Sequence, residues 1–332
     1  NGNNGGDAGN NGNNGNNGEP DMGMDVPADT TPDTPDDADG GSPCEPQPSP
    51  AEFDLTELSV NGSRVLVARP EGRIQGVMLL IHGTGGDARV YYDRVEAALF
   101  AHAALQRGML LVAPESITRG RGAAWELELD GADMANVVAT VERVQELGVP
   151  ENTPLYLVGG SNGGNMVAAI AQVLDPVSVH IFISRARAYT EEGTRVPPTF
   201  FVEGRNDSTL PREAPNAPLP FEVYERVVRQ GATAEHRYNE PAPVTPGRFT
   251  RLRNFTCPQS IAVYRALKGH DGVLDEDDML VEEWQSSGWM RALPPMAEPH
   301  ANDIGDQLKE LYGEHVPTAD FNTEVLDFML AQ

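Results

Sequence analysis

The chain has 332 residues, with 50 Asp and Glu against 24 Lys and Arg, and its formal net charge at pH 7 is −26. Nucleic acids and anionic membrane surfaces attract proteins through clustered positive charge, and the sequence contains no run of basic residues. We therefore expect neither as a partner. The length is sufficient for a folded unit with a sizeable core.

Residues 1–50 differ in composition from the rest of the chain. Residues 1–18 are almost entirely Asn and Gly, and residues 19–50 are dominated by Asp, Pro, Thr and Gly. A segment with so few large apolar side chains buries too little surface to offset the entropy lost on ordering. We predict a disordered acidic linker over residues 1–50, followed by one folded domain over residues 51–332.

This linker resembles the spacers that tether bacterial surface lipoproteins, in which a lipidated cysteine would precede Asn1. We therefore expect a protein that is secreted or held at the bacterial surface by such an anchor. The chain has two cysteines, Cys44 and Cys257. Export would permit them to form a disulfide, but without a known distance the sequence leaves paired and unpaired cysteines equally open.

The folded part opens with a predicted β-hairpin. Alternating apolar residues between Leu55 and Val67 flank Asn61-Gly62, a dipeptide typical of two-residue hairpin turns. The continuous apolar run 76–81 follows, as expected of a strand buried on both faces of a mainly parallel sheet. This strand leads into the glycine-rich turn His82-Gly83-Thr84-Gly85-Gly86.

Helices and strands then alternate along the chain. The predicted helices include 92–107, 132–147, one beginning near Asn165, and 221–229, and the predicted buried strands are 109–113, 155–158, 177–183, 198–202 and 261–267. Such alternation predicts an α/β fold with a mainly parallel sheet, flanked by helices and preceded by an antiparallel hairpin. Further helical stretches are predicted over 276–284, 304–312 and 322–330.

A Gly-x-Ser-x-Gly motif, Gly159-Gly160-Ser161-Asn162-Gly163, lies between the predicted strand 155–158 and a predicted helix. In such an elbow the serine occupies a strained turn, so the residues two before and two after it must be small. Gly159 and Gly163 meet this requirement. The bare pattern also occurs by chance, but between a strand and a helix it predicts that Ser161 is a nucleophile.

A nucleophilic serine needs a histidine base and a carboxylate that orients the histidine. Asp207 follows one predicted strand and His270 follows the last one, so we expect both at the same edge of the sheet as Ser161. The order Ser, Asp, His is that of the α/β-hydrolase arrangement. We predict Ser161 as nucleophile, Asp207 as acid and His270 as base.

Other residues compete for two of these roles. His300, in a Pro-flanked loop, is the main rival of His270 as the base. Asp175 is the rival of Asp207, although its position at a helix end favours a turn residue. The remaining histidines that we weigh against His270 and do not favour are His82, His102, His180, His236 and His315.

Residues 82–86 are expected next to the nucleophile, where backbone N–H groups would bind the oxyanion. We assign Thr84 and Asn162 to this oxyanion hole and expect His82 to order the loop; a plain glycine turn is the alternative. Trp125 is a predicted substrate-binding residue, and core packing explains it equally well. We predict no metal, since no set of His, Cys and carboxylates has ligand spacing, and no cofactor, since no nucleotide-binding motif occurs.

Together these segments resemble the esterase family that includes extracellular polyhydroxybutyrate depolymerases and feruloyl or acetylxylan esterases. The resemblance covers the chain from about Glu57 to its end. The matching stretches are Val60-Asn61-Gly62, Leu80-Ile81-His82-Gly83-Thr84-Gly85-Gly86, Gly160-Ser161-Asn162-Gly163-Gly164, Gly204 with Asp207, and Gly269-His270.

The resemblance implies two-step hydrolysis of an extracellular ester, either a polyester such as polyhydroxyalkanoate or a feruloyl or acetyl ester of plant polysaccharide. Family members often carry Trp-Pro soon after the histidine, where this chain has Asp271-Gly272-Val273. That departure bears on the substrate more than on the chemistry. The alternative functions are a surface-tethered binding protein on the same fold and a serine peptidase or amidase.

Overall fold

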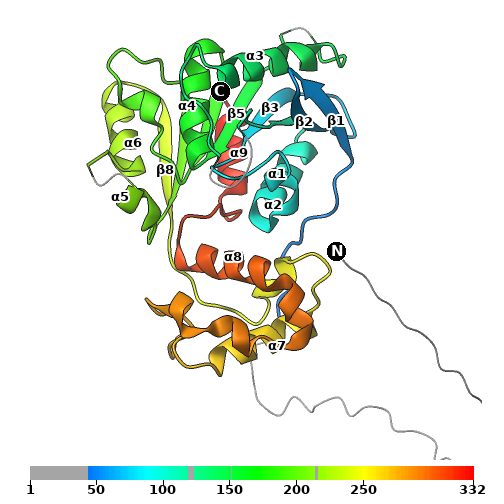
Figure 1. Ribbon diagram of the computed structural model, residues 1–332, viewed down its shortest axis with the longest axis vertical. Helices are drawn as coiled ribbons and strands as arrows, with labels where there is room; N and C mark the ends of the chain where they lie inside the picture. The colour runs from blue at the N-terminus through cyan, green and yellow to red at the C-terminus, as the bar shows by residue number, and fades with distance from the viewer. Residues whose placement is uncertain (1–43, 119–122, 151, 214–215) are drawn as a thin grey trace, which may run out of the picture. The chain divides into compact units, whose positions relative to one another are not determined.

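The computed structural model describes residues 44–118, 123–150, 152–213 and 216–332, and these contain an eight-stranded sheet in the order β1-β2-β4-β3-β5-β6-β7-β8 (Figure 1). β1 pairs antiparallel with β2, β2 pairs antiparallel with β4, and the other neighbours are parallel. The strands are β1 (Leu55–Val60), β2 (Ser63–Ala68), β3 (Gly76–Ile81), β4 (Met109–Pro114), β5 (Leu155–Gly160), β6 (Ser178–Phe182), β7 (Thr199–Gly204) and β8 (Ala234–Asn239).

Helices cover both faces of this sheet because successive strand side chains point to opposite sides. In β3, Met78 and Leu80 belong to a core formed with α2 (Val95–Gln106) and α9 (Asn322–Leu330). Leu79 belongs to a second core, on the other face. That face is covered by α3 (Ala132–Gln145), α4 (Asn162–Val173) and α6 (Pro220–Arg229). The arrangement confirms the predicted α/β-hydrolase fold with its N-terminal antiparallel hairpin.

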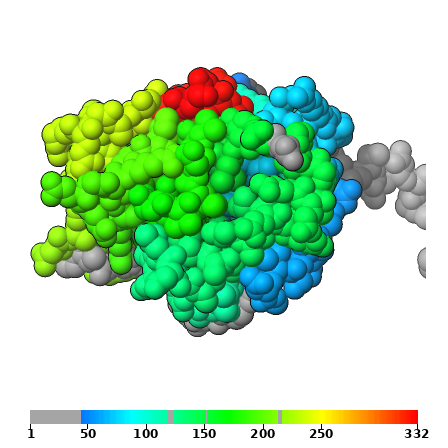
Figure 2. All heavy atoms as spheres, turned by 90° about the horizontal axis from the view of Figure 1, so that it is seen from above, coloured from blue at the N-terminus to red at the C-terminus, as the bar shows by residue number. Residues whose placement is uncertain are grey.

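Between β8 and α9 the chain forms a helical segment with its own core. This cap, residues 240–312, packs around Phe249, Trp284 and Leu308. Its main helices are α7 (Cys257–Lys268) and α8 (Ala301–Tyr312). Outside it, short helices include α1 (Val90–Asp93), α5 (Thr209–Glu213) and the 3₁₀ helix Arg187–Thr190. Figure 2 views the molecule from above, where green segments fill the middle of the visible face, the red C-terminal end lies at its upper edge, and the orange of the cap is out of sight.

The predicted last strand, 261–267, is wrong, because these residues lie in α7. Thr256 and Gln259 form a capping box at the start of this helix, and the buried residues Ser260, Val263 and Leu267 recur at helical spacing. The actual last strand, β8, was not predicted. Its sequence, Ala-Glu-His-Arg-Tyr-Asn, lacks apolar alternation, since it lies at the sheet edge and only its last residue is buried.

A disulfide joins Cys44 to Cys257, with the two Cα atoms 5.9 Å apart. The chain next to it also contacts the cap, where the Gln47 backbone N–H donates to Thr250 Oγ1 at 2.7 Å. Residues 44–50, predicted as part of the linker, are therefore held against the folded domain. The rest of the predicted linker, residues 1–43, lies outside the described residues.

Replacing both cysteines by serine should lower the free energy of unfolding by about 2–5 kcal/mol, because the bridge restricts an unfolded chain over a separation of 213 residues. Urea unfolding of the wild type with and without reductant measures the effect, and the double variant, which should not respond to reductant, is the control. Equal midpoints for the oxidised and reduced wild type would contradict the prediction.

Candidate active site

Ser161 stands at the turn between β5 and α4 with φ 53° and ψ −124°. A non-glycine residue with positive φ is strained, and such positions cluster at functional sites. The turn is possible because its neighbours lack side chains. A Cβ on Gly159 would overlap the Gly163 backbone, and one on Gly163 would overlap the carbonyl oxygen of Ile81. The serine is thereby fixed where the strand meets the helix.

The structure places His315 between Ser161 and Asp207. His315 Nε2 lies 2.9 Å from Ser161 Oγ, and His315 Nδ1 lies 2.6 Å from Asp207 Oδ2. The Asp207 side chain is buried, with 5% of its surface exposed. Its other oxygen, Oδ1, accepts the backbone N–H of Thr209 at 2.8 Å. An aspartate held in this way keeps the proton of the imidazole on Nδ1 and leaves Nε2 free to accept the serine proton.

The predicted base, His270, lies elsewhere, and that prediction is wrong. It follows the C-terminal end of α7 in the cap, where its Nε2 is 3.0 Å from the carbonyl oxygen of Ser287. The reason is that residues 261–267 form helix α7 and not a strand of the sheet, so His270 does not lie at the sheet edge. The rival base His300 stacks edge-on against Phe255, and the rival acid Asp175 forms an exposed ion pair with Arg195.

The segment that carries His315 docks on the end of β7, close to Asp207. The Asn206 backbone N–H donates to the carbonyl oxygen of Gly313 at 2.8 Å, and Asn206 Nδ2 donates to that of Tyr312 at 2.9 Å. A Cβ on Gly204 would overlap the same Gly313 oxygen. Main-chain contacts between the two segments therefore set the spacing of the acid and the histidine.

The glycine-rich turn after β3 approaches the serine. A Cβ on Gly83 would lie 3.3 Å from both the Gly160 oxygen and Ser161 Cβ. Thr84, Ser161 and His315 line one cavity of about 220 Å³. Asn162 is the first residue of α4, so its backbone N–H lacks an acceptor within the helix. The two residues predicted for the oxyanion hole thus flank the serine.

Trp125 is a buried support of this turn and does not line the cavity around Ser161. Its side chain is 3% exposed, and its indole N–H donates to the carbonyl oxygen of His82 at 2.8 Å. Its backbone N–H donates to Asn162 Oδ1 at 2.7 Å. The predicted substrate contact is therefore replaced by the alternative of core packing. His82 Nε2 accepts the Ser116 backbone N–H at 3.2 Å, as expected of a residue that orders the loop.

The described parts of the chain contain one group of acids close enough together to share a cation, namely Glu96, Glu310 and Asp320. Arg248 and Arg251 form ion pairs with these carboxylates, so the group is a charge network already balanced by guanidinium groups. Within the same described parts, no helix is long and apolar enough to cross a membrane.

Comparison with models of known protein families finds no match, and comparison with curated proteins finds none either. Among solved structures, an esterase/lipase from an uncultured bacterium is 14% identical over 58% of this chain and 76% of its own, with a TM-score of 0.40. An α/β serine hydrolase without lid from Xanthomonas campestris is 17% identical over 58% and 87%, with a TM-score of 0.41. Likenesses this distant carry no argument, so the functional conclusion depends on the site itself.

Proposed function

We propose that the protein is a serine ester hydrolase that works through an acyl-enzyme. The observation that carries this proposal is the hydrogen-bonded series Ser161, His315, Asp207 at a strained elbow beside a cavity. Nucleophile, base and orienting acid within hydrogen-bond distance are the parts that acyl transfer through serine requires.

In the proposed mechanism, His315 Nε2 takes the Ser161 proton as Oγ attacks the ester carbonyl. The negative charge that develops on the carbonyl oxygen is bound by the backbone N–H groups of Thr84 and Asn162. His315 then gives its proton to the leaving alcohol, and an acyl-serine remains. Water attacks that ester with the same histidine as base, and the acid product and free Ser161 result. Asp207 stabilises the imidazolium formed in each step.

The experiment that tests this proposal is labelling with a fluorophosphonate probe, followed by mass spectrometry of the modified peptide. A phosphonyl group on Ser161 is the expected result, because only an activated serine displaces fluoride at a useful rate. An unlabelled protein would overturn the proposal and favour a binding protein on the hydrolase fold. Labelling confined to another serine would overturn the assignment of the site.

We further propose that the ester has a short acyl unit, such as a hydroxyalkanoate polyester or an acetyl ester of polysaccharide. A volume of about 220 Å³ is small beside the roughly 300–1,000 Å³ of most ligand sites. Aromatic and aliphatic walls from Tyr91, Phe182 and Ile183 favour an apolar group of limited length. A feruloyl ester stays within the proposed class, although the cavity size favours it less.

With p-nitrophenyl esters, kcat/KM should be at least about 10-fold higher for acetate or butyrate than for decanoate, since a hydrophobic wall discriminates by about 1–3 kcal/mol for each misfitting methylene. Phe182→Ala is the matched variant, because the ring of Phe182 packs against Gly160 in the cavity wall. It should shift the preference toward longer chains. A kcat/KM that rises steadily with chain length in the wild type would contradict the proposal. Parallel p-nitroanilides separate esterase from amidase.

We also propose that the protein is exported, and either secreted or tethered to a bacterial surface by a lipid anchor ahead of the linker. The disulfide supports this proposal, because disulfides persist mainly in oxidising compartments. Fractionation of the native cells measures it. Recovery in the cytosol with both cysteines reduced would count against export.

A further inference from the structure

The loop between α8 and α9, residues 313–320, carries His315, and we call it the His loop. Its first residues dock on the end of β7, as described above. Its last residues reach a buried group of charges formed by Glu96, Arg248, Arg251 and Glu310, which we call the charge cluster. The loop is therefore held at both ends, with His315 between.

Three consecutive residues of the His loop bind the charge cluster. Thr318 Oγ1 donates to Glu310 Oε1 at 2.6 Å. The Ala319 backbone N–H donates to Glu96 Oε2 at 2.8 Å. Asp320 accepts a hydrogen bond from Arg251 Nη2 at 2.7 Å. Fixing both the side chain and the backbone of this stretch leaves the loop little freedom to shift.

The cluster is rigid because its own members are buried and paired from separate elements. Glu310, on α8, is 1% exposed and accepts from Arg248. Glu96, on α2, is 5% exposed and accepts from Arg251 Nη1 at 2.9 Å and from Gln307 Nε2 at 2.8 Å. A buried charge network of this kind is expensive to disturb, because breaking one pair leaves an uncompensated charge.

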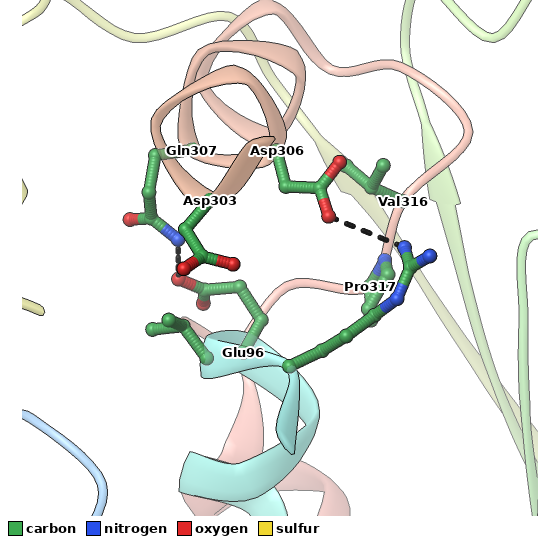
Figure 3. Close-up of a pocket in the computed structure, with 8 residues that line it drawn as sticks. Glu96, Asp303, Asp306, Gln307, Val316 and Pro317 are labelled. Atoms are coloured by element: carbon green, nitrogen blue, oxygen red, sulfur yellow. Dashed lines mark hydrogen bonds and ion pairs between the residues drawn. The ribbon is translucent and has the colours of Figure 1, made fainter. Parts of the chain in front are cut away.

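The charge cluster and the catalytic cavity are connected through the His loop. Figure 3 shows Glu96 of α2 opposite Gln307 of α8 across a small pocket, with Val316 and Pro317 of the His loop on its other side. Pro317 also lines the cavity that contains Ser161. The residues directly after His315 thus separate the charge cluster from the reacting groups.

We propose that Glu310 is a positioning residue for His315, which acts by holding Thr318 so that the His loop keeps the imidazole between Ser161 and Asp207. This inference rests on the proposed function. Among the described residues, Glu310 forms no hydrogen bond with Ser161 or His315. Its effect on the position of His315 is transmitted through Thr318 and the His loop.

The charges around Glu310 make this hold dependent on pH. Burial raises the pKa of its carboxyl to about 7, Arg248 lowers it, and Glu96 and Asp320 raise it. Arg251 also faces the carboxylate, from the 3₁₀ helix Arg248–Arg251 that it shares with Arg248. Above this pKa the ionised carboxylate accepts from Thr318 and Arg248, and below it the charge that strengthens both bonds is lost. Activity should therefore fall as the pH drops through the pKa of Glu310.

The test compares wild type, Thr318→Val, Thr318→Ser and Glu310→Gln. Thr318→Val keeps the shape of the side chain but removes the donor, and kcat should fall by about 10-fold or more with KM nearly unchanged, because small displacements of a catalytic group are costly. Thr318→Ser keeps the hydroxyl and should retain wild-type kcat. In Glu310→Gln, which carries no carboxylate to titrate, the fall in kcat/KM that the wild type shows around the pKa of Glu310 should be lost, so the two pH profiles should differ.

A second measurement reads the position of His315 without using turnover. The low-field proton resonance of the Nδ1–H that bonds Asp207 should be sharp in wild type and Thr318→Ser, and broadened or absent in Thr318→Val. The inference is overturned if Thr318→Val keeps both this resonance and wild-type kcat, or if the wild type and Glu310→Gln have the same pH profile. A failure of the proposed function gives a different result. In that case the wild type takes no fluorophosphonate label, although Thr318→Val still alters the His315 resonance.

Discussion

Replacing Ser161 by alanine should lower kcat for ester hydrolysis by about 10⁶-fold, as expected when the nucleophile of a serine triad is removed. The side chain that attacks the carbonyl is gone, and His315 Nε2, 2.9 Å from Oγ in the wild type, is left without the group it deprotonates. The residual rate, about 10³–10⁴ over water, comes from the oxyanion hole and substrate binding alone. KM should change little, because Oγ adds little to ground-state binding.

Steady-state hydrolysis of p-nitrophenyl butyrate measures this loss. The elbow tolerates a smaller side chain at position 161, so circular dichroism and the melting temperature should match those of the wild type. Ser286→Ala, which changes an exposed serine of the cap, is the matched control and should keep full activity. Retention of even one per cent of the wild-type kcat in Ser161→Ala would contradict the proposed mechanism.

The elbow was predictable because it depends on local chemistry. A strained serine between a buried strand and a helix requires small residues two positions before and two after it. This requirement can be recognised within five consecutive residues. The structure shows the reason at Gly163, where any side chain would overlap the carbonyl oxygen of Ile81. The buried strands of the parallel sheet were predictable on similar grounds, since they are continuous apolar runs of the expected length.

The histidine was not predictable by the same reasoning, because its position depends on contacts between distant segments. The cap is inserted after β8, and β8 is a polar edge strand with no periodic signal. His315 reaches Ser161 only because Gly313 packs against Gly204 and bonds Asn206 across more than 100 residues of sequence. One local signal was available, since Thr256, Pro258 and Gln259 mark a helix start and argue against a strand over 261–267.

Alanine variants of the two histidines decide between the position that the sequence favoured and the one that the structure shows. His315→Ala should lower kcat by about 10⁶-fold, close to the loss in Ser161→Ala, because the base and the nucleophile act as one unit. His270→Ala should keep kcat within about 2-fold of the wild type, because its ring bonds the Ser287 carbonyl oxygen in the cap and not Ser161 or Asp207.

The double variant Ser161→Ala, His315→Ala sharpens the test. If the two residues form one catalytic unit, the second substitution should add almost nothing to the first, whereas independent contributions would multiply. Fluorophosphonate labelling of Ser161 should distinguish the two histidines in the same way. His270→Ala should be modified rapidly and His315→Ala not at all. The opposite result would be labelling of His315→Ala at the wild-type rate and no labelling of His270→Ala. It would identify His270 as the base and refute the Ser161, His315, Asp207 series.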